Sequence, residues 1–189
     1  MKKILALVGM IFLISLLSSC ANNDLLDGSI FVYNADNQRI YLGMTRDEVG
    51  DLIPDLEPFN PDSEDFHMLI SRSEHISVDF GFDGRLDSIT LHTPWRSNPA
   101  HFEPVWFFRG GLAPGIPLEA FFEHHDGAYA YAQFFSDRFS DDRQRVEIYF
   151  SETFEYVKVD SDDIAHRIIV VFYTDTGVIN SISFGPRLF

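Results

Sequence analysis

The chain contains few of the residues on which catalytic and disulfide-stabilised proteins commonly depend. Its 189 residues include a single cysteine, Cys20, which excludes a disulfide within the chain. It has no GxSxG or HExxH motif, the spacings that many nucleophilic hydrolases and zinc proteases require. The sequence therefore does not support an enzyme, and we expect no cofactor.

No apolar run is long enough to cross a membrane. Met1-Lys2-Lys3 precedes an apolar stretch of roughly a dozen residues, shorter than the ~20 that a span needs. Leu17-Ser18-Ser19-Cys20 follows and matches the lipobox of bacterial lipoproteins. We expect residues 1–19 to be a cleaved signal peptide and residues 20–29 a tether lipidated at Cys20. An ordinary secretory signal with a chance cysteine is the alternative.

This signal predicts a location in the cell envelope, lipid-anchored on the extracytoplasmic side of a membrane. Ala21 follows the cysteine instead of the aspartate that commonly signals inner-membrane retention. An outer-membrane location is therefore open if the source has two membranes.

Basic residues are scarce in the remaining chain. Loss of Lys2 and Lys3 with the signal lowers the 14 basic residues to 12 against 29 acidic ones, a formal charge of −17. Such a charge repels nucleic acid and anionic lipid headgroups and favours basic partners or cations. Solubility alone is the simpler explanation. We expect no nucleic-acid partner.

Two segments of the chain resemble each other. Residues 75–94 read HISVDFGFDGRLDSITLHTP and residues 167–186 read RIIVVFYTDTGVINSISFGP. Each predicts a strand, a turn centred on aspartate and a second strand. Asp83-Gly84 suits a tight hairpin in the first copy, and Gly177 suits a bulged three-residue turn in the second.

A helix start precedes each hairpin. Thr45 is a good N-cap, Glu48 completes a capping box, and Pro54 ends the helix. In the second copy Pro117 occupies the first helical position. We expect further strands near residues 66–72 and 146–159.

These elements predict an α+β fold of two helix-plus-antiparallel-hairpin repeats. Neither repeat can bury its sheet alone, so we expect one antiparallel sheet with the helices on one face. The first repeat would span residues 30–94 and the second residues 111–189. Residues 95–110 would connect them.

Residues 42–49, LGMTRDEV, resemble the LGMTxxEV helix opening of the BamE/SmpA-OmlA lipoproteins and of the beta-lactamase-inhibitor-protein-like fold. In those families a helical pair precedes an antiparallel sheet, and the inhibitor proteins carry the unit twice. The lipobox is also typical of the BamE-like group. The second copy departs from the motif and reads GIPLE at residues 115–119. The resemblance implies protein binding, as an inhibitor or within an envelope assembly, and does not imply catalysis.

Four residues are candidates for binding contacts. Inhibitors of the resembled fold present a hairpin tip and a concave sheet to an enzyme cleft, which makes Asp83 a candidate. Turn chemistry alone also explains an Asp-Gly pair. Trp95, Trp106 and Phe108 are candidates for an aromatic binding surface, and Trp and Phe are as often core residues as contact residues.

Two clusters of ligand-type residues lack metal-site spacing. Residues 123–126 read EHHD, and neighbouring histidines on a helix diverge by ~100°. Residues 160–163 read DSDD without the glycine and glutamate of an EF-hand. We therefore expect no metal site.

The sequence is best explained as a membrane-anchored, non-catalytic protein-binding or envelope scaffold module whose partner is another protein. An inhibitor or immunity-type protein for one enzyme is one alternative. A metal or solute binder that uses His124 and His125 is a second, and a structural role in outer-membrane assembly is a third.

Overall fold

The main element of the fold is one large antiparallel β-sheet. The computed structural model describes residues 31–60, 67–94, 102–124, 127–136, 141–153 and 155–186. Nine strands form the sheet in the order β10-β9-β11-β12-β6-β5-β4-β3, with β8 also paired to β9. The strands are β3 (Glu57–Pro58), β4 (Met68–Ser71), β5 (Ile76–Phe80), β6 (Leu86–His92), β8 (Gln133–Ser136), β9 (Arg143–Phe150), β10 (Tyr156–Val157), β11 (His166–Tyr173) and β12 (Ile179–Pro186).

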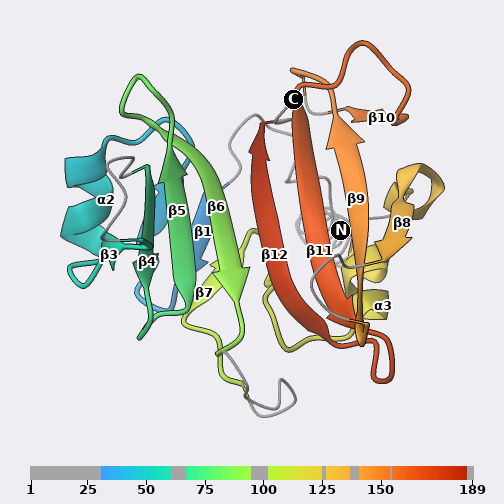
Figure 1. The fold of residues 1–189 in the computed structure, drawn as a ribbon, viewed down its shortest axis with the longest axis horizontal. Helices are drawn as coiled ribbons and strands as arrows, with labels where there is room; N and C mark the ends of the chain where they lie inside the picture. The colour runs from blue at the N-terminus through green and yellow to red at the C-terminus, as the bar shows by residue number, and fades with distance from the viewer. Residues whose placement is uncertain are drawn as a thin grey trace, which may run out of the picture.

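A second sheet of three strands lies behind β5 and β6 (Figure 1). Its order is β2-β1-β7, from β1 (Phe31–Asn34), β2 (Arg39–Tyr41) and β7 (Trp106–Phe108). Val32 pairs with Ile40 on one side and Phe108 on the other, and all three side chains are buried in the core. Ile89 and Ile182 of the large sheet belong to the same core. The core therefore lies between the two sheets, and the large sheet turns its other face, the open face, toward the viewer in Figure 1.

Two seven-residue helices lie near opposite ends of the large sheet, α2 (Arg46–Leu52) beside β4 and α3 (Leu118–His124) near β9 (Figure 1). The capping box of α2 forms as the sequence predicts, because the Glu48 N–H donates to Thr45 Oγ1 and the Thr45 N–H donates to the Glu48 carboxylate. Val49 and Phe121 bring the two helices into the core. A 3-10 helix, η3 (Ala128–Tyr131), precedes β8.

The segment before each helix is hydrogen-bonded to the hairpin that follows it. Residues 43–44 exchange backbone hydrogen bonds of 2.8 and 2.7 Å with Leu86, and residues 115–116 exchange two of 2.8 Å with Ile179. Gly43 and Gly115 have φ angles of 91° and 94°, a region where only glycine is free of steric strain. The same pair of backbone bonds therefore occurs at both of these segments.

Both hairpins also contain an irregularity at the same relative position. The β5–β6 register skips Asp87, and the β11–β12 register skips Asn180. Each skipped residue directly follows the one that is bonded to the segment before the helix, Leu86 or Ile179. Such bulges increase local strand twist.

The two hairpins join through β6 and β12, where Thr90 pairs with Ser183. The α+β class therefore agrees with the expectation, and the large sheet is continuous across both halves. The arrangement differs from the expected one in three places. A second sheet, β2-β1-β7, accompanies the large one. The expected connector, 95–110, contains β7, and the strand expected at 146–159 is interrupted after β9 because the Ser151 N–H turns to bond the Glu155 carbonyl.

Candidate functional site

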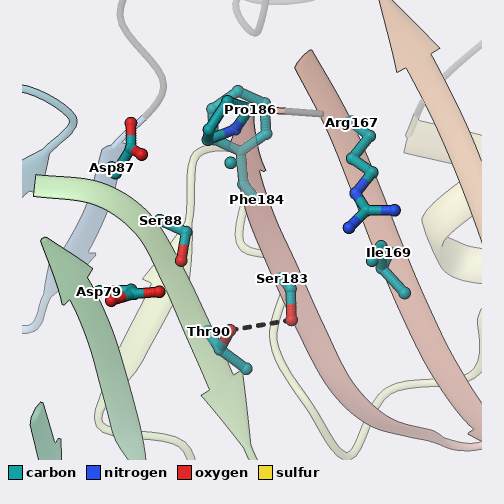
Figure 2. Close-up of a pocket in the computed structure, with 10 residues that line it drawn as sticks. Asp79, Asp87, Ser88, Thr90, Arg167, Ile169, Ser183, Phe184 and Pro186 are labelled. Atoms are coloured by element: carbon teal, nitrogen blue, oxygen red, sulfur yellow. Dashed lines mark hydrogen bonds between the residues drawn. The ribbon is translucent and has the colours of Figure 1, made fainter. Parts of the chain in front are cut away.

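The open face of the large sheet carries small polar side chains where the two halves meet. Ser88 and Thr90 come from β6, and Ser183 and Gly185 come from β12. The Thr90 hydroxyl donates to Ser183 Oγ at 2.9 Å. Because these side chains are short, they leave a recess of about 180 Å³, shown in Figure 2.

A glycine allows the close approach of the strands at one end of the recess. A Cβ atom added to Gly185 would lie 2.6 Å from the Ser88 Cβ and 3.3 Å from the Asp87 carbonyl oxygen. Carbon atoms in van der Waals contact are ordinarily about 3.5–4.0 Å apart. Any larger residue at position 185 would therefore push β12 away from β6.

The two walls of the recess differ in charge. Arg167 and Ile169 of β11 form one wall, while Asp79 and Asp87 lie on the other side (Figure 2). Burial raises the pKa of the Asp87 carboxyl, and the carboxylates of Asp79 and Asp83 raise it further. A cation beside the acidic wall would therefore stabilise the ionised form of Asp87.

The arginine wall is held in place by a buried carboxylate. Glu147 is only 3% exposed and lies 3.1 Å from Arg145 Nε and 3.6 Å from Arg167 Nη1. The Tyr149 hydroxyl donates to the same carboxylate at 2.6 Å. Paired in this way, Arg167 has a defined position beside the recess.

The recess can supply hydrogen bonds and charge, but it contains no nucleophile beside a base. Its two central hydroxyls bond each other. At about 180 Å³, the recess is smaller than the ~300–1,000 Å³ typical of small-molecule sites. Within the described ranges, no group of three or more His, Cys, Asp or Glu residues is placed to hold a metal ion.

The β5–β6 hairpin tip extends the acidic wall. Asp83 Oδ1 accepts a hydrogen bond from the Arg85 N–H at 3.0 Å, and Gly84 has a φ of 75°. A Cβ on Gly81 would touch both the Asp83 and Asp87 carboxylates, so the tip and the recess adjoin. Asp83 thus has the turn role that its sequence context explains, together with a place at the edge of the candidate site.

Phe82, beside Asp83, is fully exposed. Its ring meets His67 edge to face at 5.4 Å. The alternating pattern of β5 places Phe82 on the buried face, but β5 ends at Phe80 and Phe82 falls in the turn. The sequence does contain a signal for this exposure, because Phe82 directly precedes the Asp83-Gly84 turn.

Trp106 and Phe108 lie in the core, with exposures of 1% and 4%. The Trp106 indole N–H donates to the Glu74 carboxylate. Both side chains alternate inward from β7, which pairs with β1. This burial is inconsistent with the aromatic contact surface expected at these two positions.

The other sequence candidates lie outside the described residues or at their limit. Cys20, Trp95 and His125 are outside the described residues, and the side chain of His124 is not described.

No family model, curated protein or solved structure matches this chain. Among the described residues, no helix combines the length and apolar character needed to cross a bilayer. The fold and the site together define an α+β protein with a polar, recessed sheet face.

Proposed function

We propose that this protein is a non-catalytic protein-binding module, anchored through lipid at Cys20 on the extracytoplasmic side of a membrane in the cell envelope. The observation that carries the proposal is the open sheet face, whose recess adjoins a hairpin tip with a fully exposed phenylalanine. A shallow recess beside a protruding aromatic suits a protein partner, because aromatic anchors supply much of the binding energy at protein interfaces.

The charge around the recess indicates which partner surface would fit. Asp79 and Asp83 lie close enough to Asp87 to disfavour its ionised form, and a Lys or Arg side chain of the partner would relieve that repulsion. The net charge of the chain acts in the same direction and would speed encounter with a basic partner. The partner surface would combine basic residues with an apolar pocket for Phe82.

We also propose that the chain consists of two copies of one helix-plus-hairpin unit. Three observations support this: the matched bonds of residues 43–44 and 115–116, the matched bulges at Asp87 and Asn180, and the pairing of Thr90 with Ser183. Aligning Leu86 with Ile179 makes Thr90 and Ser183 equivalent, so they would lie at the local symmetry axis. The resemblance to the BamE-like and inhibitor families remains a proposal on the same basis.

An inhibitor or immunity-type protein is the second candidate, favoured by the exposure of Phe82 at the hairpin tip. A protruding hairpin can enter an enzyme cleft, whereas a scaffold would use the broader sheet face. Phe82→Ala distinguishes the two, since it should abolish inhibition but only weaken binding that is spread over the sheet.

Crosslinking and recovery of the tagged, lipidated protein from its own membranes tests the proposal. We expect one dominant protein partner, lost with Cys20→Ala when the unanchored form leaves the membrane and lost with Thr90→Arg when the recess is filled. Thr176→Arg, in the exposed β11–β12 turn, is the matched control and should keep the partner. Equal recovery with Thr90→Arg and the wild type would contradict binding at the recess.

A further inference from the structure

The outer side of the small sheet differs from the rest of this acidic protein. Strands β1, β2 and β7 contain no aspartate or glutamate, although the chain has 29 acidic residues. Since Val32, Ile40 and Phe108 point into the core, the alternate residues point outward. We name them, with Arg109, the outer aromatic face: Phe31, Tyr33, Arg39, Tyr41, Phe107 and Arg109.

The outer aromatic face is a continuous set of rings and guanidinium groups. Arg39 and Arg109 stack on the Phe31 ring at 4.6 and 5.5 Å. Tyr33 contacts Phe31 at 6.3 Å and Phe107 at 5.9 Å between ring centroids. Tyr41, opposite Phe31, is 48% exposed. Tyrosine rings and arginines with their stems on apolar surface are typical of the membrane–water interface.

The outer aromatic face begins close in the chain to the proposed lipid anchor. Phe31 is 11 residues after Cys20, a distance of at most ~40 Å even when the chain is fully extended. The lipid anchor therefore keeps β1 near the bilayer surface at high effective concentration. The open face lies on the opposite side of the molecule, beyond the core and the large sheet.

We propose that the outer aromatic face rests on the lipid headgroups of the anchoring membrane and turns the open face away from it, toward the partner. This inference depends on the proposed lipidation of Cys20. The negative charge of the whole chain does not oppose the contact at this face, because charges more than ~8 Å away are largely screened at physiological ionic strength. The charged residues on or next to these strands are Arg39 in β2, Arg109 directly after β7 and Asp36 in the β1–β2 turn, so the carboxylate is outnumbered by arginines.

Collisional quenching of a single fluorophore tests this orientation. Because lipid blocks the thiol of Cys20, Tyr41→Cys gives the mature lipoprotein one reactive thiol for a nitrobenzoxadiazole label. Ile169→Cys, on the open face beside the recess, is the control. Each protein is reconstituted in phosphatidylethanolamine–phosphatidylglycerol vesicles, and flotation first establishes that it is anchored.

We expect lipid-borne nitroxide to quench the label at position 41 about threefold more than at position 169, because an interfacial group lies only 5–10 Å into the headgroup region. Arg39→Glu should reduce that difference at least by half, while Arg72→Glu, on an exposed arginine of the β4–β5 turn, should not. Equal quenching at both positions in floating vesicles would overturn the orientation. Protection of position 41 from aqueous iodide without nitroxide quenching would also overturn it, since the tether or another segment would then cover the face. A protein that fails to float instead contradicts the lipidation itself.

Discussion

Thr90 and Ser183, 93 residues apart in the chain, face each other across β6 and β12, and the Thr90 hydroxyl donates to Ser183 Oγ at 2.9 Å. In the described part of the chain, β6 and β12 are the only strand pair that joins the two hairpins into one sheet, and this hydrogen bond lies between them. The same two side chains form the floor of the recess. The junction of the halves and the proposed binding site are therefore the same place.

The two hydroxyls should be energetically coupled. Thr90→Val and Ser183→Ala should each lower the free energy of unfolding by about 0.5–1.5 kcal/mol, because each leaves the other hydroxyl without its partner. The double variant should lose less than the sum of the two. A double-mutant cycle by urea unfolding measures the coupling, and strictly additive losses would show that the hydrogen bond contributes nothing.

Gly185→Ala should weaken the junction without removing any contact. The added methyl carbon would lie 2.6 Å from the Ser88 Cβ, and overpacking of this kind costs about 1–3 kcal/mol of unfolding free energy. Gly50→Ala in α2 is the control, since its Cβ meets nothing within 4 Å and alanine favours a helix by about 0.5–1 kcal/mol. Thermal unfolding should move in opposite directions for the two variants. A stable Gly185→Ala protein would refute the close approach.

Glu147→Gln should destabilise the β9–β11 region. The buried carboxylate pairs Arg145 and Arg167 and accepts from Tyr149, so a neutral amide leaves two guanidinium groups without their counter-ion. We expect a loss of about 1–3 kcal/mol, below the 3–5 kcal/mol of a fully buried pair because the arginines are partly exposed. Glu57→Gln breaks the surface pair with Arg72, of which both partners are mostly exposed, and should change stability by less than 1 kcal/mol. Equal effects from the two variants would contradict a structural role for Glu147.

The raised pKa of Asp87 predicts that the stability of the protein depends on pH in a specific way. Its pKa in the folded protein is raised above the ordinary value of 3.8 by burial and by Asp79 and Asp83, so the folded state binds this proton more tightly than the unfolded state. The Asp87 contribution to stability therefore falls as pH rises from 3.8 through the folded pKa. Asp87→Asn should be more stable than the wild type at pH 7, and the difference should vanish below pH 3.8. Urea unfolding at pH 3 and pH 7 measures it, and a difference that persists at pH 3 would assign the effect to packing.

The elements with strong periodicity or a turn signal were predictable from the sequence. The alternation in residues 76–80, the Asp83-Gly84 turn and the Thr45 cap all correspond to observed elements. The small sheet was missed because strands of three and four residues are too short to show a period. Its pairing of β1 with β7 joins segments more than 70 residues apart, which local patterns do not report.

The candidate site was less predictable, for two physical reasons. Composition does not orient an aromatic ring, so Trp106 was expected at a surface although β7 turns it into the core. The recess is made of Ser88, Thr90, Ser183 and Gly185, and small polar residues on a strand carry no distinctive signal. They become a site only when β6 pairs with β12.

Site-specific photocrosslinking in native membranes tests whether a partner protein binds at the open face. A photoreactive phenylalanine analogue at position 82 replaces an exposed phenylalanine at the hairpin tip beside the recess and leaves the recess unfilled. After irradiation it should yield one discrete crosslinked protein, and the same analogue at position 176, in the exposed β11–β12 turn, should not. That result would locate the partner beside the recess. No crosslink at position 82, or an identical pattern from both positions, would contradict binding at the open face.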